Sequence, residues 1–122
     1  MNQVQAQVRN AYQTNQVTTA SPKKLLIMLY DGAIKNLRLA ELAMNQKDIE
    51  NINKYLTKTQ AIISEFMSTL NFEDGGDVAK NLYQLYEYMN RRLVRANIDK
   101  DVEPIKEVRK YLEELRDTWM QI

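Results

Sequence analysis

The sequence predicts an all-α protein, folded as an antiparallel up-and-down four-helix bundle with a mobile N-terminal arm. Glycine and proline are scarce, with 3 and 2 in 122 residues, which indicates few turns and therefore few, long elements. Four segments carry apolar residues at alternating spacings of three and four, the pattern of a helix with one buried side. Short connections between these segments favour antiparallel neighbours. A chain of this length is expected to form one domain, which we divide into an arm at 1–20 and a bundle at 21–122.

The arm differs in composition from the rest of the chain. Eight of its twenty residues are Asn or Gln, and none is acidic. Composition alone favours a disordered terminus. Its main apolar side chains are Val8, Tyr12 and Val17, and so few anchors predict weak docking once the entropy of ordering the segment is subtracted.

The first predicted helix spans 22–46, with Ser21 as N-cap and Pro22 at the first helical position. Its apolar seam is Leu26, Tyr30, Ala33, Leu37, Ala40 and Met44. Gly32 lies inside this helix, where glycine costs about 1 kcal/mol relative to alanine. We expect close approach of another backbone as compensation, either from a neighbouring helix or from a bound peptide.

The second predicted helix spans 48–70, and a break with two glycines follows at 71–77. The seam of this helix is Ile49, Ile52, Leu56, Thr59, Ile63, Phe66 and Leu70. The third helix is predicted at 78–98 with Asp77 as its N-cap. The fourth is predicted at 102–120, with Pro104 tolerated in its first turn. Its seam is Ile105, Val108, Leu112, Leu115, Trp119 and Ile122.

The third helix has more apolar surface than a bundle helix needs. Its core seam is Leu82, Leu85, Met89, Leu93 and Ala96, and a second stripe contains Ala79, Tyr83, Tyr86 and Val94. The surplus predicts a groove for a partner helix or peptide, and the seven Tyr and six Met of the chain suit such an interface. On this interpretation, replacing Tyr86 by alanine weakens partner binding and leaves a folded bundle.

The composition excludes several functional classes. The chain has neither Cys nor His, so it cannot form a disulfide, a thiol nucleophile, a catalytic triad with His or a zinc site built on these residues. Its 17 basic and 16 acidic residues give no electrostatic case for nucleic acid or for an anionic membrane. No apolar run approaches the length of a transmembrane helix, and the N-terminus has no signal-like apolar region.

Three charged clusters have ordinary structural explanations. Asp74 and Asp77 lack the other ligands of a calcium loop. The basic group of Arg91, Arg92, Arg95 and Lys100 is interpreted as cations near a helix C-terminus. Glu113, Glu114 and Asp117 are interpreted as a solvated surface, because no feature of the sequence predicts the burial that catalytic carboxylates need. We therefore expect no enzyme activity, cofactor or metal.

Two long motifs carry a resemblance to a known family. Residues 12–34 read Y-x-x-N-x-V-x-T-A-S-P-K-K-L-L-I-M-L-Y-D-G-A-I. Residues 75–97 read G-G-D-V-A-K-N-L-Y-Q-L-Y-E-Y-M-N-R-R-L-V-R-A-N, and T-L-N at 69–71 and the late Trp119 continue the pattern. These motifs closely resemble the flagellar secretion chaperone FliS family, in order and over essentially the whole chain.

The resemblance implies a cytosolic, non-enzymatic four-helix bundle that binds the C-terminal segment of flagellin as an extended chain with short helices. Such a chaperone prevents premature polymerisation and aids delivery to the export gate of the flagellar type III apparatus. The arm becomes a displaceable lid over the client surface. The candidate client-binding residues are Tyr12, Asn15, Val17, Tyr30, Gly32, Leu82, Tyr83, Leu85, Tyr86, Met89, Leu93 and Val94. The motif does not say which of these contact the client and which belong to the core.

One alternative stays open from the residues themselves. The surplus apolar surface is also compatible with a structural or regulatory bundle that pairs as a homodimer and has no flagellin client. An enzyme using carboxylates or lysine is disfavoured, because the sequence contains no phosphate-binding glycine loop and no His or Cys.

Overall fold

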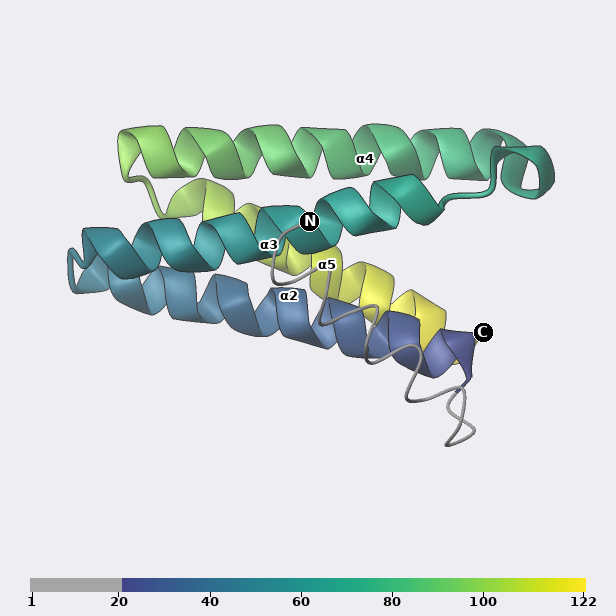
Figure 1. The fold of residues 1–122 in the computed structure, drawn as a ribbon, viewed down its shortest axis with the longest axis horizontal. Helices are drawn as coiled ribbons and strands as arrows, with labels where there is room; N and C mark the ends of the chain where they lie inside the picture. The colour runs from purple at the N-terminus through teal and green to yellow at the C-terminus, as the bar shows by residue number, and fades with distance from the viewer. Residues whose placement is uncertain (1–20) are drawn as a thin grey trace.

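The computed structural model describes residues 21–122, which form four helices (Figure 1). They are α2 (Pro22–Asn45), α3 (Ile49–Thr69), α4 (Phe72–Asp99) and α5 (Glu103–Gln121). Consecutive helices pack against each other with alternating direction, and α5 returns to pack against α2. The helices α2 and α4 are therefore diagonal across the bundle, as are α3 and α5. The all-α, four-helix prediction is confirmed.

The helix starts follow from local capping chemistry. The Ser21 hydroxyl accepts a hydrogen bond from the backbone N–H of Lys24 at 3.1 Å, and Pro22 takes the first helical position. A carboxylate oxygen of Asp48 accepts one from the backbone N–H of Asn51 at 3.2 Å. At the start of α5, Pro104 lies in the first turn, as the sequence predicts.

The predicted break at 71–77 is wrong over most of its length. The chain becomes helical at Phe72, and Asn71 caps this start by accepting from the backbone N–H of Asp74 at 3.1 Å. Asn71 is as good an N-cap as Asp77, and acidic residues in the first turn suit the helix dipole. Only Gly76 is non-helical, with φ 50° and ψ −125°, so the break is a kink at one residue (Figure 1).

The core lies along the axis between the four helices. Its centre includes one leucine from each helix, Leu37, Leu56, Leu93 and Leu112, and all four are fully buried. The predicted seams are right in their middles and wrong at two helix ends, because Ile49 and Ile122 are exposed. At a helix end the neighbouring helices stop, so an apolar residue there has nothing to pack against. No helix within residues 21–122 has the length and apolar character needed to cross a membrane.

Gly32 does not meet another backbone. A Cβ built at this position would lie 3.9 Å from a terminal methyl carbon of Ile62, which is ordinary van der Waals contact. The expectation of a close backbone approach from a neighbouring helix is therefore wrong. Gly76 differs from Gly32 in its backbone. A Cβ there has open space, but the backbone conformation is one that residues with a side chain rarely adopt.

Replacing these two glycines by alanine should change the stability of the bundle in opposite directions. We expect Gly32→Ala to stabilise the bundle by about 0.5–1 kcal/mol, because alanine loses less backbone entropy in a helix. Gly76→Ala should destabilise it by about 1–3 kcal/mol, the cost of holding a strained backbone. Urea unfolding followed by circular dichroism measures both. A loss of stability in Gly32→Ala would contradict the unstrained contact expected between the new Cβ and the Ile62 methyl carbon.

Candidate functional site

The second apolar stripe predicted on the third helix divides between core and surface. Tyr86 is 2% exposed and Ala79 is also buried, whereas Tyr83 is 37% exposed and Val94 is 48% exposed. The placement of Tyr86 on a surface stripe is therefore wrong. Because α4 packs against both α3 and α5 and faces α2 across the axis, a wide arc of this helix is buried, and Tyr86 lies inside that arc.

Tyr86 belongs to an aromatic layer to which each helix contributes one ring: Tyr30 from α2, Phe66 from α3, Tyr86 from α4 and Trp119 from α5. Tyr30 stacks on Phe66 with ring centroids 4.4 Å apart, and Phe66 lies 5.4 Å from Tyr86. The hydroxyls of Tyr30 and Tyr86 share a buried hydrogen bond, and the indole N–H of Trp119 donates to the Tyr30 hydroxyl oxygen at 3.3 Å. The layer therefore ties together all four helices.

The two buried hydroxyls stay neutral. Burial raises the pKa of Tyr30, and burial together with the neighbouring Tyr30 raises the pKa of Tyr86. Neither phenol becomes a useful base or nucleophile at physiological pH, because neither ionises there. The chemistry of the layer is hydrogen bonding and packing, which is a structural role.

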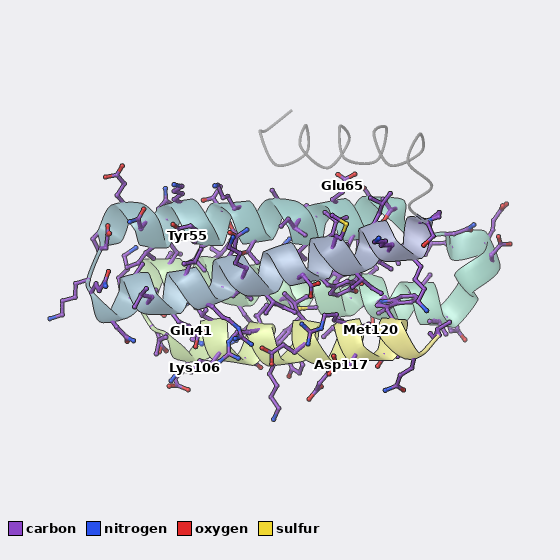
Figure 2. All side chains as sticks on the ribbon, turned by 90° about the horizontal axis from the view of Figure 1, so that it is seen from below. Glu41, Tyr55, Glu65, Lys106, Asp117 and Met120 are labelled. Carbon is purple, nitrogen blue, oxygen red and sulfur yellow. The ribbon has the colours of Figure 1, made fainter. Side chains whose placement is uncertain are left out.

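The helix α5 is held on both sides by charged hydrogen bonds. Towards α2, Arg109 makes two bonds to the carboxylate of Glu41, at 2.6 and 3.2 Å, and a third at 3.0 Å to Glu113. Figure 2 shows Glu41 on the side of α2 that faces α5. Arg38 on α2 also bonds Glu113, at 3.0 Å. Glu113 is therefore only partly on the solvated surface expected for its cluster, with 26% of its side chain exposed.

Towards α4, the carboxylate of Glu107 accepts bonds from Arg92 at 2.7 Å, Tyr88 at 2.8 Å and Tyr111 at 3.4 Å. Burial opposes ionisation of Glu107, but the bonds from Arg92 and Tyr88 outweigh it and lower its pKa. Arg92 thus pairs with α5 and is not simply a cation at a helix end.

The interface between α3 and α4, which we call the α3–α4 seam, differs from the two interfaces of α5 in its polar contacts. Within residues 21–122 no ion pair crosses it. Uncharged side chains bridge it instead, from Asn90 to Ser64 at 3.2 Å and from Asn97 to Asn53 at 3.2 Å. A groove of about 330 Å³ opens along this seam, which we call the α3–α4 groove. It is lined by Ser64, Met67, Glu87, Asn90, Arg91 and Val94.

A line of exposed apolar residues runs along α4 beside this groove. We call Phe72, Tyr83, Val94 and Ile98 the α4 stripe; each is a large, exposed apolar side chain. Tyr83, Val94 and Ile98 fall within about 60° around the helix at 100° per residue. The ring of Phe72 lies 5.9 Å from that of Tyr83 across the kink. From Tyr83 to Ile98 the stripe is about 22 Å long at 1.5 Å per residue.

The candidate residues therefore separate by location. Tyr30, Tyr86, Met89 and Leu93 are buried, and Leu82, Leu85 and Gly32 are partly buried. Tyr83 and Val94 lie on the surface, together on the α4 stripe. Tyr12, Asn15 and Val17 lie outside the described residues. For the buried residues, the structure supports a contribution to the fold.

Sequence reasoning did not select seven residues of this surface as candidates: Ser64, Met67, Phe72, Glu87, Asn90, Arg91 and Ile98. Ile98 was available from the pattern, because it follows Val94 by one helical turn. Phe72 was hidden because the segment before Gly76 reads as a loop. Met67 and Asn90 come together only because α3 and α4 pack side by side.

The comparisons with known proteins agree over nearly the whole chain. The family described as "Flagellar protein FliS" matches residues 4–122. A flagellar secretion chaperone FliS of Bacillus subtilis is 43% identical over 111 residues, which cover 91% of this chain and 82% of that protein. FliS chaperones of Vibrio cholerae and Salmonella typhimurium are 39% and 40% identical, over 88% and 87% of this chain and 79% of each relative. The chain therefore belongs to the FliS family of flagellar secretion chaperones.

Proposed function

We propose that this protein binds the C-terminal region of flagellin in the cytosol, keeps it from polymerising and delivers it to the export gate of the flagellar secretion apparatus. Family membership supports the role of an export chaperone. The observation that supports a client site on this chain is the α4 stripe beside the α3–α4 groove. Exposed apolar side chains along one helix are typical of a surface that takes a partner.

The position of the stripe suits a client that binds and later leaves. In the described part of the chain, α5 is fastened to α2 and α4 by ion pairs, and the α3–α4 seam has none. A partner lying on this seam therefore breaks no charged contact between helices. Binding thus does not have to strip water from these partly exposed ion pairs, and release does not have to re-form them.

The length of the stripe also suits an extended segment. At about 3.3 Å per residue, its 22 Å match about six or seven extended residues. Ordering each of those residues costs about 1–2 kcal/mol of backbone entropy, so binding needs several separate apolar contacts. We propose that Tyr83 and Val94 make two of them, and that Tyr12, Asn15 and Val17 belong to a lid that competes for or closes over the client.

The direct test mixes the full chain with a flagellin C-terminal fragment. Light scattering should give a one-to-one complex, and calorimetry should give saturable binding. The chain alone should scatter as a monomer at the same concentration. A stable dimer that is indifferent to the fragment would contradict the proposal and support the homodimer alternative.

A further inference from the structure

The α3–α4 groove contains an unpaired hydrogen-bond acceptor. The amide nitrogen of Asn90 donates to the Ser64 hydroxyl oxygen at 3.2 Å and lies 4.0 Å from the Met67 sulfur. The amide oxygen of the same side chain is buried and has no hydrogen-bond partner among residues 21–122, and no other buried side-chain polar atom in that range lacks one. Leaving such a group unpaired is unfavourable, because the oxygen has lost water without gaining a protein donor.

The surroundings of Asn90 say what kind of group would satisfy this oxygen. Met67 and Val94 make the groove apolar beside it, so the donor has to come on a mainly apolar ligand. The oxygen is covered in the free protein, and Met67, whose sulfur lies 4.0 Å from the amide nitrogen, has an unbranched side chain with three rotatable bonds that can move aside. The site thus fits a ligand that displaces a flexible side chain and supplies one N–H.

A main-chain N–H in an extended segment has this chemistry. In an extended chain the N–H groups are free and the flanking side chains can be aliphatic. In the middle of a helix each N–H is already bonded to the carbonyl four residues earlier, so a helix of a second copy offers no such donor. Glu87 and Arg91 on the groove rim form no ion pair within the described chain, so they are available to charges of either sign on the segment.

We propose that Asn90 determines which client conformation the groove accepts, by taking a hydrogen bond from a main-chain N–H of an extended client segment. The inference rests on the proposed function, because the client is the flagellin C-terminal region. The free protein already carries the cost of the unpaired oxygen. Binding therefore gains most of a hydrogen bond without first stripping water from this acceptor.

The proposal predicts opposite effects on stability and binding in Asn90→Leu. Leucine has a similar volume and removes the unpaired oxygen from an apolar site. We expect the thermal midpoint to rise by about 3–5 °C, while affinity for a flagellin C-terminal fragment falls about tenfold. Thermal unfolding by circular dichroism and titration calorimetry measure the two quantities.

The matched control is Asn53→Ala, which also removes an amide hydrogen bond between α3 and α4 but lies outside the groove. It should leave affinity unchanged and should not raise the midpoint. If Asn90→Leu lowers both stability and affinity, Asn90 is simply structural and the proposal is wrong. Unchanged affinity in Asn90→Leu overturns it as well.

A second measurement identifies the donor. In a second series of fragments, one main-chain N–H at a time is replaced by an ester oxygen. At one position this replacement should weaken binding to the wild type. The same replacement should not weaken binding to Asn90→Leu any further, because that variant lacks the acceptor. If no position behaves in this way, the donor is not the main chain and the proposal fails. If the wild type does not bind the unmodified fragment, the proposed function itself fails, so the two failures are distinguishable.

Discussion

Replacing Tyr86 by alanine should destabilise the bundle by about 3–5 kcal/mol, the range for removing a large buried aromatic side chain. The substitution empties a site that is 2% exposed, removes the ring packed against Phe66 and leaves the Tyr30 hydroxyl without its bond to Tyr86. Domains of this size have a total stability of about 5–15 kcal/mol, so a large share of it is lost. Urea unfolding should show the loss directly. Any fall in client binding would then follow from unfolding and not from a lost client contact.

Two variants separate packing from surface effects. Tyr86→Phe keeps the ring and removes one hydroxyl of the shared bond, so it should cost about 1–2 kcal/mol. Tyr83→Ala removes a tyrosine from the same helix at a site that is 37% exposed, and should cost less than about 1 kcal/mol. The fluorescence of Trp119, the single tryptophan, reports on the layer in each variant. If Tyr86→Ala costs no more than Tyr83→Ala, the aromatic layer does not stabilise the bundle.

The difference between Tyr83 and Tyr86 could have been predicted from sequence periodicity. Spacing places Leu82, Leu85 and Met89 on one side of α4, and these do face the core or its edge. Tyr86 lies four residues after Leu82 and three before Met89, so it falls on that same side, whereas Tyr83 is turned about 100° away from Leu82. The spacing therefore predicts a buried Tyr86 and a more exposed Tyr83, as the structure shows, and grouping the two in one stripe misreads the pattern.

Contacts between helices are the part that the sequence could not supply. Spacing within one helix predicts pairs such as Arg95 with Asp99, which does form at 3.1 Å. It does not predict that Glu107 receives Arg92 and Tyr88 from another helix, or that Arg109 reaches Glu41. The four-helix architecture was predictable because it depends on apolar periodicity and turn residues. The candidate site was not, since it is built from residues of two helices at their seam.

Replacing Val94 by aspartate should severely weaken the proposed binding of flagellin without unfolding the protein. Val94 is 48% exposed and is the residue shared by the α4 stripe and the α3–α4 groove. In the free protein the new carboxylate stays in water, so stability should change by less than about 0.5 kcal/mol. In the complex it is either buried without a partner or forces the client away, and it adds to the negative charge of nearby Glu87. We expect affinity to fall at least about thirtyfold, equivalent to about 2 kcal/mol.

The matched control is Leu42→Asp. Leu42 is 51% exposed, close to the value for Val94, but it lies on α2, which is diagonal to α4 across the bundle. The same change of an exposed aliphatic residue to a carboxylate is thus made far from the proposed client surface. Calorimetry with the flagellin C-terminal fragment should show wild-type affinity for Leu42→Asp and a severe loss for Val94→Asp. Equal losses in both would mean that net charge governs binding, and a loss only in Leu42→Asp would move the client to the α2 side of the bundle.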